Sequence, residues 1–228
     1  MTDMMHSFEL FQPASMSEAT SLLDKYGDKA WIIAGGMDSL DWFKDRYKHP
    51  EALIDISGLK DLRGIADKGA YVSIGALTTL TEIEESSLLQ KHFPVLTEAA
   101  GRVASPQIRN AGTLGGNVSQ DTWCLYYRDG FPCYRAGGNT CHANTPTGMN
   151  REHTLFEASR CVAVSPSDTA PALVVLEAEM VIQRGGKERI VPAEAFFVAP
   201  AIDILHMTVL RKGDVLKEIR MPKTWAGS

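Results

Sequence analysis

The sequence predicts an α+β protein with one irregular insertion that carries all of its cysteines. Apolar stretches of strand type and of amphipathic helix type alternate through most of the 228 residues. Hydrophobic residues make up 44% and charged residues 22%, which indicates a globular chain with a core and argues against disorder. The exception is residues 119–165, which show little periodicity; an irregular stretch of that length usually has a functional reason.

The acidic charge balance limits the kinds of partner. There are 23 Lys and Arg against 28 Asp and Glu, a formal charge of −5, which disfavours nucleic acid or an anionic membrane. No apolar run approaches the roughly 20 residues that a membrane span needs. Residues 1–15 lack the basic and apolar regions of a secretory signal. We therefore expect a soluble cytoplasmic protein.

The first elements are a strand, a helix and a second strand. Residues 8–13 are of strand type, and a helix follows over about 17–27, with Ser15 or Ser17 as its N-cap. Residues 31–36, WIIAGG, predict a buried strand that leads into a tight glycine turn.

The middle of the chain predicts two strands that pair and two helices. Residues 52–59 and 71–80 have strand patterns, and we expect them to be partners. Helices are expected over 81–92, with Thr81 as the cap, and over about 94–102.

Regular structure resumes after the insertion. Residues 167–178 predict a helix. Strands are expected over 179–186, 187–197 and 214–222, and no internal repeat is present.

Two glycine-rich loops are candidates for binding a phosphate-bearing ligand. The first is AGGMDSL at residues 34–40, directly after a predicted strand, and the second is TLGGN at residues 113–117. Paired glycines let backbone N–H groups approach a diphosphate because no Cβ intervenes. Neither loop matches the dinucleotide fingerprint or the P-loop, and each taken singly is more often a tight turn. Two such loops in one chain favour a shared ligand.

The four cysteines have the spacing C-x8-C-x7-C-x19-C, and such grouping favours one shared role. Two disulfides would need an oxidising compartment, to which nothing points. A structural zinc could use the thiolates with His142 or His153 as substitutes, although the short paired knuckles typical of zinc are missing. The thiols could also hold a [4Fe–4S] cluster, or be unligated or redox-active, and the spacing does not decide among these roles.

Both glycine loops resemble those of one family. AGGMDSL resembles the A-G-G-[TS]-D-L loop, and RNAGTLGGN resembles the R-N-x-G-T-[IL]-G-G-N loop, of the FAD-binding subunit of molybdenum hydroxylases. This is the xanthine dehydrogenase and carbon monoxide dehydrogenase flavoprotein family. ISGL, IGALTT, SDTAPALVVLEA and DVLKEIRMP fall in the family's order, so the likeness covers nearly the whole chain. The resemblance implies the FAD-binding fold of the vanillyl-alcohol-oxidase (PCMH) type, with two α/β subdomains at 1–57 and 58–228.

The resemblance also implies which residues bind FAD. The first loop would line the pyrophosphate, the second would face it, Asp168 would bind an FAD hydroxyl, and Leu216 would lie near the flavin ring. Asp168 could instead cap a helix, and Leu216 could be ordinary core. The implied FAD residues are Ile32, Ala34, Gly35, Gly36, Met37, Asp38, Ser39, Thr113, Gly115, Gly116, Asn117, Asp168 and Leu216.

A subgroup of this family inserts a loop with a [4Fe–4S] cluster, at the place of residues 119–165 here. CLYY and TCHA resemble the insertion of 4-hydroxybenzoyl-CoA reductase. FPCY, NREH and the C-x-A-x-x-P-S-D exit look more like that of bacterial aldehyde oxidoreductases. The resemblance implies that Cys124, Cys133, Cys141 and Cys161 ligate the cluster.

The function that the resemblance implies is electron transfer. A large molybdopterin subunit would react with the organic substrate, and a small subunit with [2Fe–2S] centres would relay electrons to FAD on this chain. The [4Fe–4S] cluster would serve a one-electron carrier such as ferredoxin. No catalytic side chain is expected, and neither nucleic acid nor a membrane is an expected partner.

Two departures from the family pattern stand out. Met37 replaces the usual Thr or Ser, so only its backbone N–H could serve a phosphate. The family continues into a C-terminal domain; the sequence stops at Ser228, so we expect that domain to be absent, trimmed or on another polypeptide. Two competing hypotheses are a stand-alone flavin reductase of the same fold, against which the cysteines argue, and a zinc-bearing scaffold without enzymatic activity.

Overall fold

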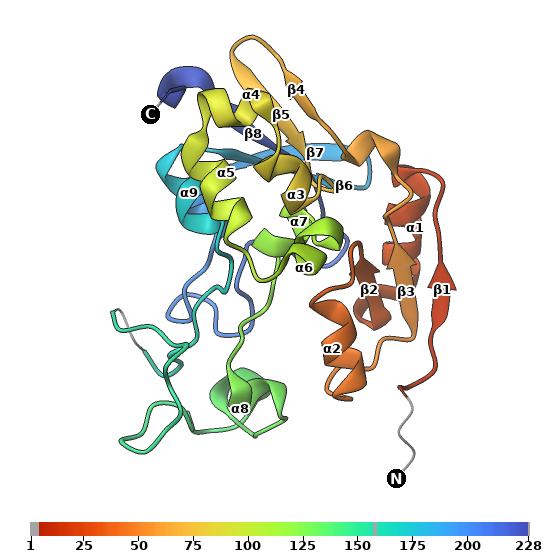
Figure 1. Cartoon of the computed structure of the whole chain (residues 1–228). Helices are drawn as coiled ribbons and strands as arrows, with labels where there is room; N and C mark the ends of the chain where they lie inside the picture. Colours follow the sequence, from red (N-terminus) through yellow and green to blue (C-terminus); the bar gives the residue numbers. More distant parts are fainter. Residues whose placement is uncertain (1–4, 157–158, 228) are drawn as a thin grey trace.

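The structure, a computed structural model, describes residues 5–156 and 159–227, which form two sheets and a layer of short helices (Figure 1). The smaller sheet is parallel, with the order β1-β3-β2. The larger sheet is antiparallel, with the order β4-β5-β8-β6-β7. The strands are β1 (Glu9–Phe11), β2 (Ala30–Ile33), β3 (Ala52–Asp55), β4 (Ile65–Asp67), β5 (Tyr71–Gly75), β6 (Glu179–Arg184), β7 (Lys187–Pro192) and β8 (Val215–Pro222).

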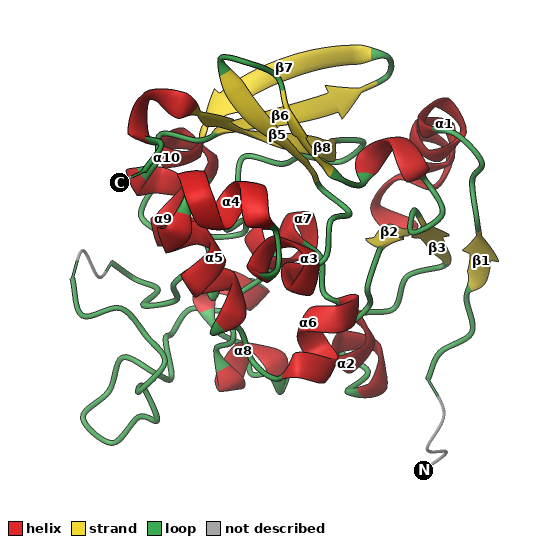
Figure 2. Cartoon of the chain, turned by 45° about the horizontal axis from the view of Figure 1, so that its top comes forward, coloured by secondary structure: helices red, strands yellow, loops and turns green. Residues whose placement is uncertain are grey.

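Helices pack against both sheets. Figure 2 shows the antiparallel sheet with α3, α4, α5 and α9 gathered on one side of it. The helices are α1 (Met16–Tyr26), α2 (Ser39–Lys44), α3 (Leu80–Glu84), α4 (Ser87–His92), α5 (Pro94–Gly101), α6 (Pro106–Ala111), α7 (Leu114–Val118), α8 (Leu125–Arg128), α9 (Ala170–Val175) and α10 (Ala193–Phe196). This is the α+β class that the sequence predicts.

The main core lies between the antiparallel sheet and its helices. Ile74 of β5, Ile83 of α3, Leu96 of α5 and Met180 of β6 are fully buried there. A second cluster joins Leu23 of α1 to Ile54 of the parallel sheet and to Val215 of β8. Burial of these apolar side chains is the main source of stability and holds the glycine loops in place.

The sequence predicts the start of one helix correctly and misplaces the start of another. The Ser15 side chain accepts from the Glu18 amide and caps α1, so of the two predicted caps, Ser15 and Ser17, it is Ser15 that begins the helix. The predicted helix over 81–92 is instead two short helices, α3 and α4. Its cap is Thr79 rather than Thr81, because Thr79 and Glu82 form a reciprocal capping box.

The predicted pairing of residues 52–59 with 71–80 is wrong. β3 lies between β1 and β2 in the parallel sheet, whereas β5 pairs with β4 and β8. The strand pattern of each segment is correct, but alternation of apolar residues specifies a face and not a partner. The strands of the parallel sheet all lie within residues 9–55 and those of the antiparallel sheet within 65–222. The subdomain boundary at residue 57 stays a prediction.

Candidate functional site

The first glycine loop follows β2 directly and leads into α2. Gly36 has a φ of +73°, a left-handed conformation that glycine adopts without strain. Within the part of the chain that the structure describes, the amides of Gly36, Met37 and Asp38 donate to no acceptor. Successive free N–H groups around a left-handed residue form a concave site for an anion. The loop therefore fits a phosphate through backbone donors alone, which suits a methionine at position 37.

The first glycine loop lies against the end of α6, directly before the second glycine loop. A Cβ on Gly35 would lie 1.9 Å from the carbonyl oxygen of Ala111, at the end of α6. Only a residue without a side chain allows this approach. The structure thus places the first loop against residues 111–112, which lead directly into the second loop, although the two loops are about 80 residues apart in sequence.

The second glycine loop is internally hydrogen-bonded. Leu114 and Gly115 donate their amides to the carbonyl oxygens of Thr78 and Ala76, at 2.9 and 2.8 Å. The Gly116 amide donates to Thr113 Oγ1 at 3.1 Å, which makes Thr113 the N-cap of α7. These amides are used within the protein, so this loop can shape a binding site but is not a source of free backbone donors.

Asn117 connects the second loop to the chain that precedes α9. Its Oδ1 accepts from the hydroxyls of Ser167 and Thr169, both at 2.7 Å, and all three side chains are buried. Its Nδ2 has no acceptor among the described residues and remains available to a ligand. Asp168 lies between these two hydroxyl residues.

Asp168 does not cap a helix, so that interpretation of the residue is wrong. α9 begins only at Ala170, and the Ser167 hydroxyl accepts the Ala170 amide at 3.2 Å. Asp168 is exposed in the preceding turn. It lines a broad hollow together with Arg102 and Trp123.

The other residues that were predicted to bind FAD mostly contact the protein's own side chains. Ile32 and Ala34 are half-buried and pack against the cluster that joins α1 to the parallel sheet. Ser39 accepts a hydrogen bond from Trp31 Nε1 at 3.0 Å. Leu216 of β8 is 6% exposed and belongs to the main core. The assignment of these residues to FAD binding stays a prediction.

Asp38 has its carboxylate occupied by the protein. One oxygen accepts from Arg128 at 2.8 Å and the other from Trp42 Nε1 at 3.2 Å. Arg128 lies in α8, inside the cysteine-bearing segment, residues 119–165. The structure therefore joins the first glycine loop to that segment, a contact that the sequence did not predict.

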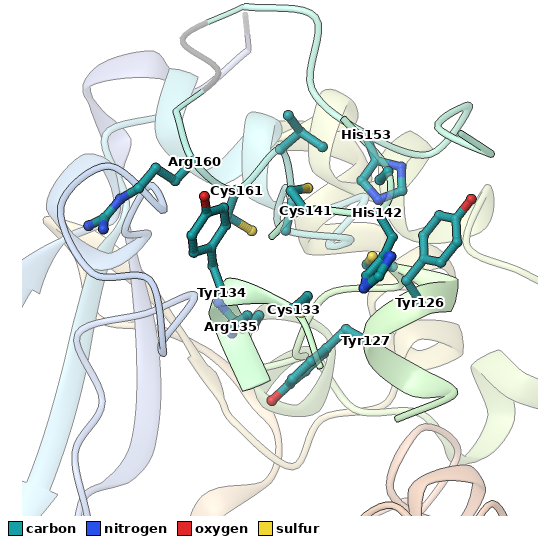
Figure 3. Close-up of a pocket in the computed structure, with 14 residues that line it drawn as sticks. Tyr126, Tyr127, Cys133, Tyr134, Arg135, Cys141, His142, His153, Arg160 and Cys161 are labelled. Atoms are coloured by element: carbon teal, nitrogen blue, oxygen red, sulfur yellow. The ribbon is translucent and has the colours of Figure 1, made fainter. Parts of the chain in front are cut away.

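All four cysteines line one small cavity (Figure 3). Cys124, Cys133 and Cys161 are buried, Cys141 is half-buried, and none forms a disulfide. Burial raises the pKa of the Cys124 and Cys161 thiols, and neighbouring cysteines raise it further. The irregular segment thus gathers its thiols at one place, as a shared role requires.

Several buried polar atoms around this cavity have no hydrogen-bond partner among the described residues. Arg135 Nε, His142 Nε2 and both ring nitrogens of His153 are buried without a hydrogen bond among the described residues. Orphaned buried polar atoms are costly and indicate a missing ligand, ion or water. Among residues 5–156 and 159–227, however, no three His, Cys, Asp or Glu side chains are grouped so that they could hold one metal ion.

Two buried arginines in the cysteine-bearing segment were not identified from the sequence. Arg128 is 7% exposed and Arg135 is 4% exposed. Arg128 pairs with Asp38, 90 positions away, whereas Arg135 pairs with Asp121, 14 positions away, and donates to the carbonyl oxygen of Ile204, 69 positions away. No local pattern could have distinguished them from surface arginines.

The fold and the two packed glycine loops define a FAD-binding domain of the vanillyl-alcohol-oxidase (PCMH) type. The family described as FAD binding domain in molybdopterin dehydrogenase matches residues 6–224. The chain belongs to this family, which confirms the resemblance to its FAD-binding subunits; the resemblance to the subgroup with a [4Fe–4S] insertion stays a prediction.

Individual relatives agree with this assignment. The chain is 32% identical over 216 residues to the carbon monoxide dehydrogenase medium chain of Hydrogenophaga pseudoflava, covering 94% of this chain and 58% of the relative. It is 34% identical over 203 residues to the aldehyde oxidoreductase FAD-binding subunit PaoB of Escherichia coli strain K12, covering 87% and 63%. A solved structure of the Hydrogenophaga carbon monoxide dehydrogenase, lacking the Mo-pyranopterin moiety, matches with a TM-score of 0.72 and 30% identity. That match covers 96% of this chain and 60% of the solved one.

The chain spans about three fifths of the length of these relatives. Within residues 5–156 and 159–227, none of the helices has the length and hydropathy that a membrane-spanning segment requires.

Proposed function

We propose that the chain is the electron-transfer, FAD-binding subunit of a molybdopterin-dependent dehydrogenase, an oxidoreductase complex. Its partners would be a large molybdopterin subunit and a small subunit with [2Fe–2S] centres. Support comes from the family and from relatives that are themselves named medium chain or FAD-binding subunit. A cytoplasmic location stays a prediction from the sequence.

The observation that carries the proposal is the first glycine loop packed against residues 111–112, which lead directly into the second loop. The free amides of Gly36, Met37 and Asp38 would bind the FAD pyrophosphate, and residues 113–117 would form the opposite wall. Asn117 Nδ2 and the exposed Asp168 carboxylate are further polar groups free to bind FAD. When bound, FAD would supply the exchange between two-electron and one-electron chemistry, while these residues bind and orient it.

We further propose that Cys124, Cys133, Cys141 and Cys161 hold a [4Fe–4S] cluster in the cavity that they line. The described residues hold no preformed group of ligands for a metal ion, and the cysteine spacing lacks the short paired knuckles typical of zinc. A cluster needs its thiolates distributed around a larger body, which four cysteines around one cavity can supply. Arg135 Nε and the two histidines would donate to sulfur atoms and tune the cluster. A one-electron carrier such as ferredoxin would be the external partner.

The test is to purify the protein anaerobically, with any co-purifying subunits, and to measure flavin, iron, sulfide and zinc per chain. We expect one FAD, and about four irons with matching sulfide beyond those of the small subunit. Cys133→Ser should remove these irons and the associated visible absorption. FAD without the four irons would overturn the cluster proposal only. Neither FAD nor iron in the intact complex would overturn the whole function.

A further inference from the structure

Arg128 is a buried cation enclosed by aromatic rings. Its guanidinium carbon lies 4.2 Å from the ring centroid of Trp42 and 4.0 Å from that of Trp123. The side chain is only 8% exposed. Trp42 belongs to α2, directly after the first glycine loop, whereas Trp123 belongs to the cysteine-bearing segment. The guanidinium therefore lies between two parts of the chain that are remote in sequence.

The guanidinium donates to both of these parts. It donates through Nε to the carbonyl oxygen of Thr122 at 3.0 Å and through Nη2 to that of Asp121 at 3.3 Å. The same Nη2 donates to Asp38 Oδ1 at 2.8 Å. A planar fork of fixed donors can make these bonds together, which a lysine ammonium on a flexible stem cannot reproduce.

Asp38 is held in one orientation as a result. Arg128 and Trp42 use both carboxylate oxygens, and Asp38 makes no side-chain cap on α2 although it is the N-cap residue. Its carboxylate is directed into the protein while its amide stays free. An isolated carboxylate beside a pyrophosphate would repel it, and pairing with a buried cation removes that repulsion.

We propose that Arg128 is a positioning residue for FAD, and that the cysteine-bearing segment is thereby part of the flavin-binding unit. The inference rests on the proposed FAD function. Arg128 fixes Asp38, neutralises it and holds the amides of residues 36–38 in the shape that binds the pyrophosphate. It contacts FAD only through this loop.

The first test is FAD titration of flavin-depleted protein, followed by flavin fluorescence. Arg128→Met should raise the Kd for FAD about tenfold or more, the size of a typical coupling between sites. The matched control is Arg220→Met, since Arg220 also pairs with a half-buried carboxylate, Glu218, and stacks on an aromatic ring, Tyr71. Arg220 has no hydrogen bond or ion pair to either glycine loop among the described residues. We expect it to lower thermal stability without changing the Kd.

A conservative variant and a double mutant separate positioning from general damage. Arg128→Lys should give an affinity between those of the wild type and Arg128→Met, because it restores the charge and not the fork. Asp38→Asn should weaken FAD binding, and adding Arg128→Met should cost little more, because the two groups act as a pair. The lysine variant carries the test if Arg128→Met does not fold.

The outcomes are distinct. An unchanged Kd in folded Arg128→Met, or equal weakening in Arg220→Met, would overturn the positioning role while wild-type FAD binding stands. Failure of the wild type itself to bind FAD would overturn the proposed function instead.

Discussion

At the scale of single residues, Gly35 has the strictest steric requirement in the two glycine loops. Any Cβ there would overlap the carbonyl oxygen of Ala111, which belongs to the backbone and cannot rotate away. Larger residues must therefore separate the loops. Gly36 differs, because its constraint is the positive φ rather than a close neighbour.

We expect Gly35→Ala to weaken FAD binding at least about tenfold, because the two walls of the site move apart. Overpacking should also lower the free energy of unfolding by about 1–3 kcal/mol. The matched control is Gly58→Ala, since no atom lies within 4 Å of the position that its Cβ would take and its φ is not positive. Equal Kd values for FAD in the two variants, measured by fluorescence titration, would contradict the packing of the loops.

The sequence predicted the candidate site better than it predicted the contacts that hold it. The glycine pairs and the grouped cysteines are local signals, and they identified the loops and the cavity. The buried pair of Asp38 and Arg128 depends on a contact across 90 positions, and no single sequence reports such a contact. Asp168 shows the same limit, because the start of α9 depends on the Ser167 hydroxyl bound between the helix and Asn117.

At the scale of elements, buried hydrogen bonds join α7 to the residues that lead into α9. Asn117 is the acceptor for Ser167 and Thr169, so its removal leaves two buried hydroxyls without this partner. We expect Asn117→Ala to lower the free energy of unfolding by about 1–3 kcal/mol in urea titrations. Asn110→Ala is the control, because the Asn110 amide oxygen accepts from Thr81 in an exposed place. A similar loss in both variants would show that burial does not decide the effect.

A carboxylate in the central strand of the antiparallel sheet should make the stability of the protein depend on pH. Burial alone would raise the pKa of Glu218 in β8, but the hydrogen bond from Ser73 and the ion pair with Arg220 together lower it below its ordinary value of 4.5. A carboxylate of this kind contributes stability above its unfolded-state pKa and loses it as the pH falls through the folded-state pKa.

Glu218→Gln should therefore cost about 1–2 kcal/mol at pH 7 and progressively less below about pH 4.5. The measurement is urea unfolding of wild type and variant from pH 7 to pH 3. Two parallel curves of stability against pH would be incompatible with the lowered pKa.

Strand partners were the least predictable feature at this scale. The apolar pattern of residues 52–59 is equally compatible with the antiparallel sheet and with the parallel one. The choice of sheet is decided by the apolar cluster that Ile54 of β3 forms with Leu23 of α1, and this contact depends on the whole fold. Local caps, in contrast, depend on three or four neighbouring residues and could be predicted at Ser15.

At the scale of the whole molecule, the cysteine-bearing segment follows α7 in sequence but packs on the other half of the protein. Cys124, Tyr127 and Cys133 form one apolar cluster with Trp42 and Leu53. No residue of 119–165 belongs to the buried cluster of the antiparallel sheet among the described residues. The segment therefore stabilises the α2 side of the parallel sheet, where the first glycine loop also lies.

This arrangement predicts where the protein loosens if the proposed [4Fe–4S] cluster is lost. Cys133→Ser should release the proposed [4Fe–4S] cluster. Hydrogen exchange should then accelerate at least about tenfold in residues 119–165 and in residues 39–55, which pack against that segment. β5, β6 and β8 serve as the internal control, because their core contains none of the segment's side chains. Their amides should keep wild-type protection. Equal acceleration in both sheets would mean that the cysteines stabilise the fold globally, and unchanged protection at 39–55 would mean that the apolar contacts alone hold the segment. Acceleration confined to the segment and residues 39–55 would show that metal ligation by the cysteines stabilises the half of the molecule that carries the first glycine loop.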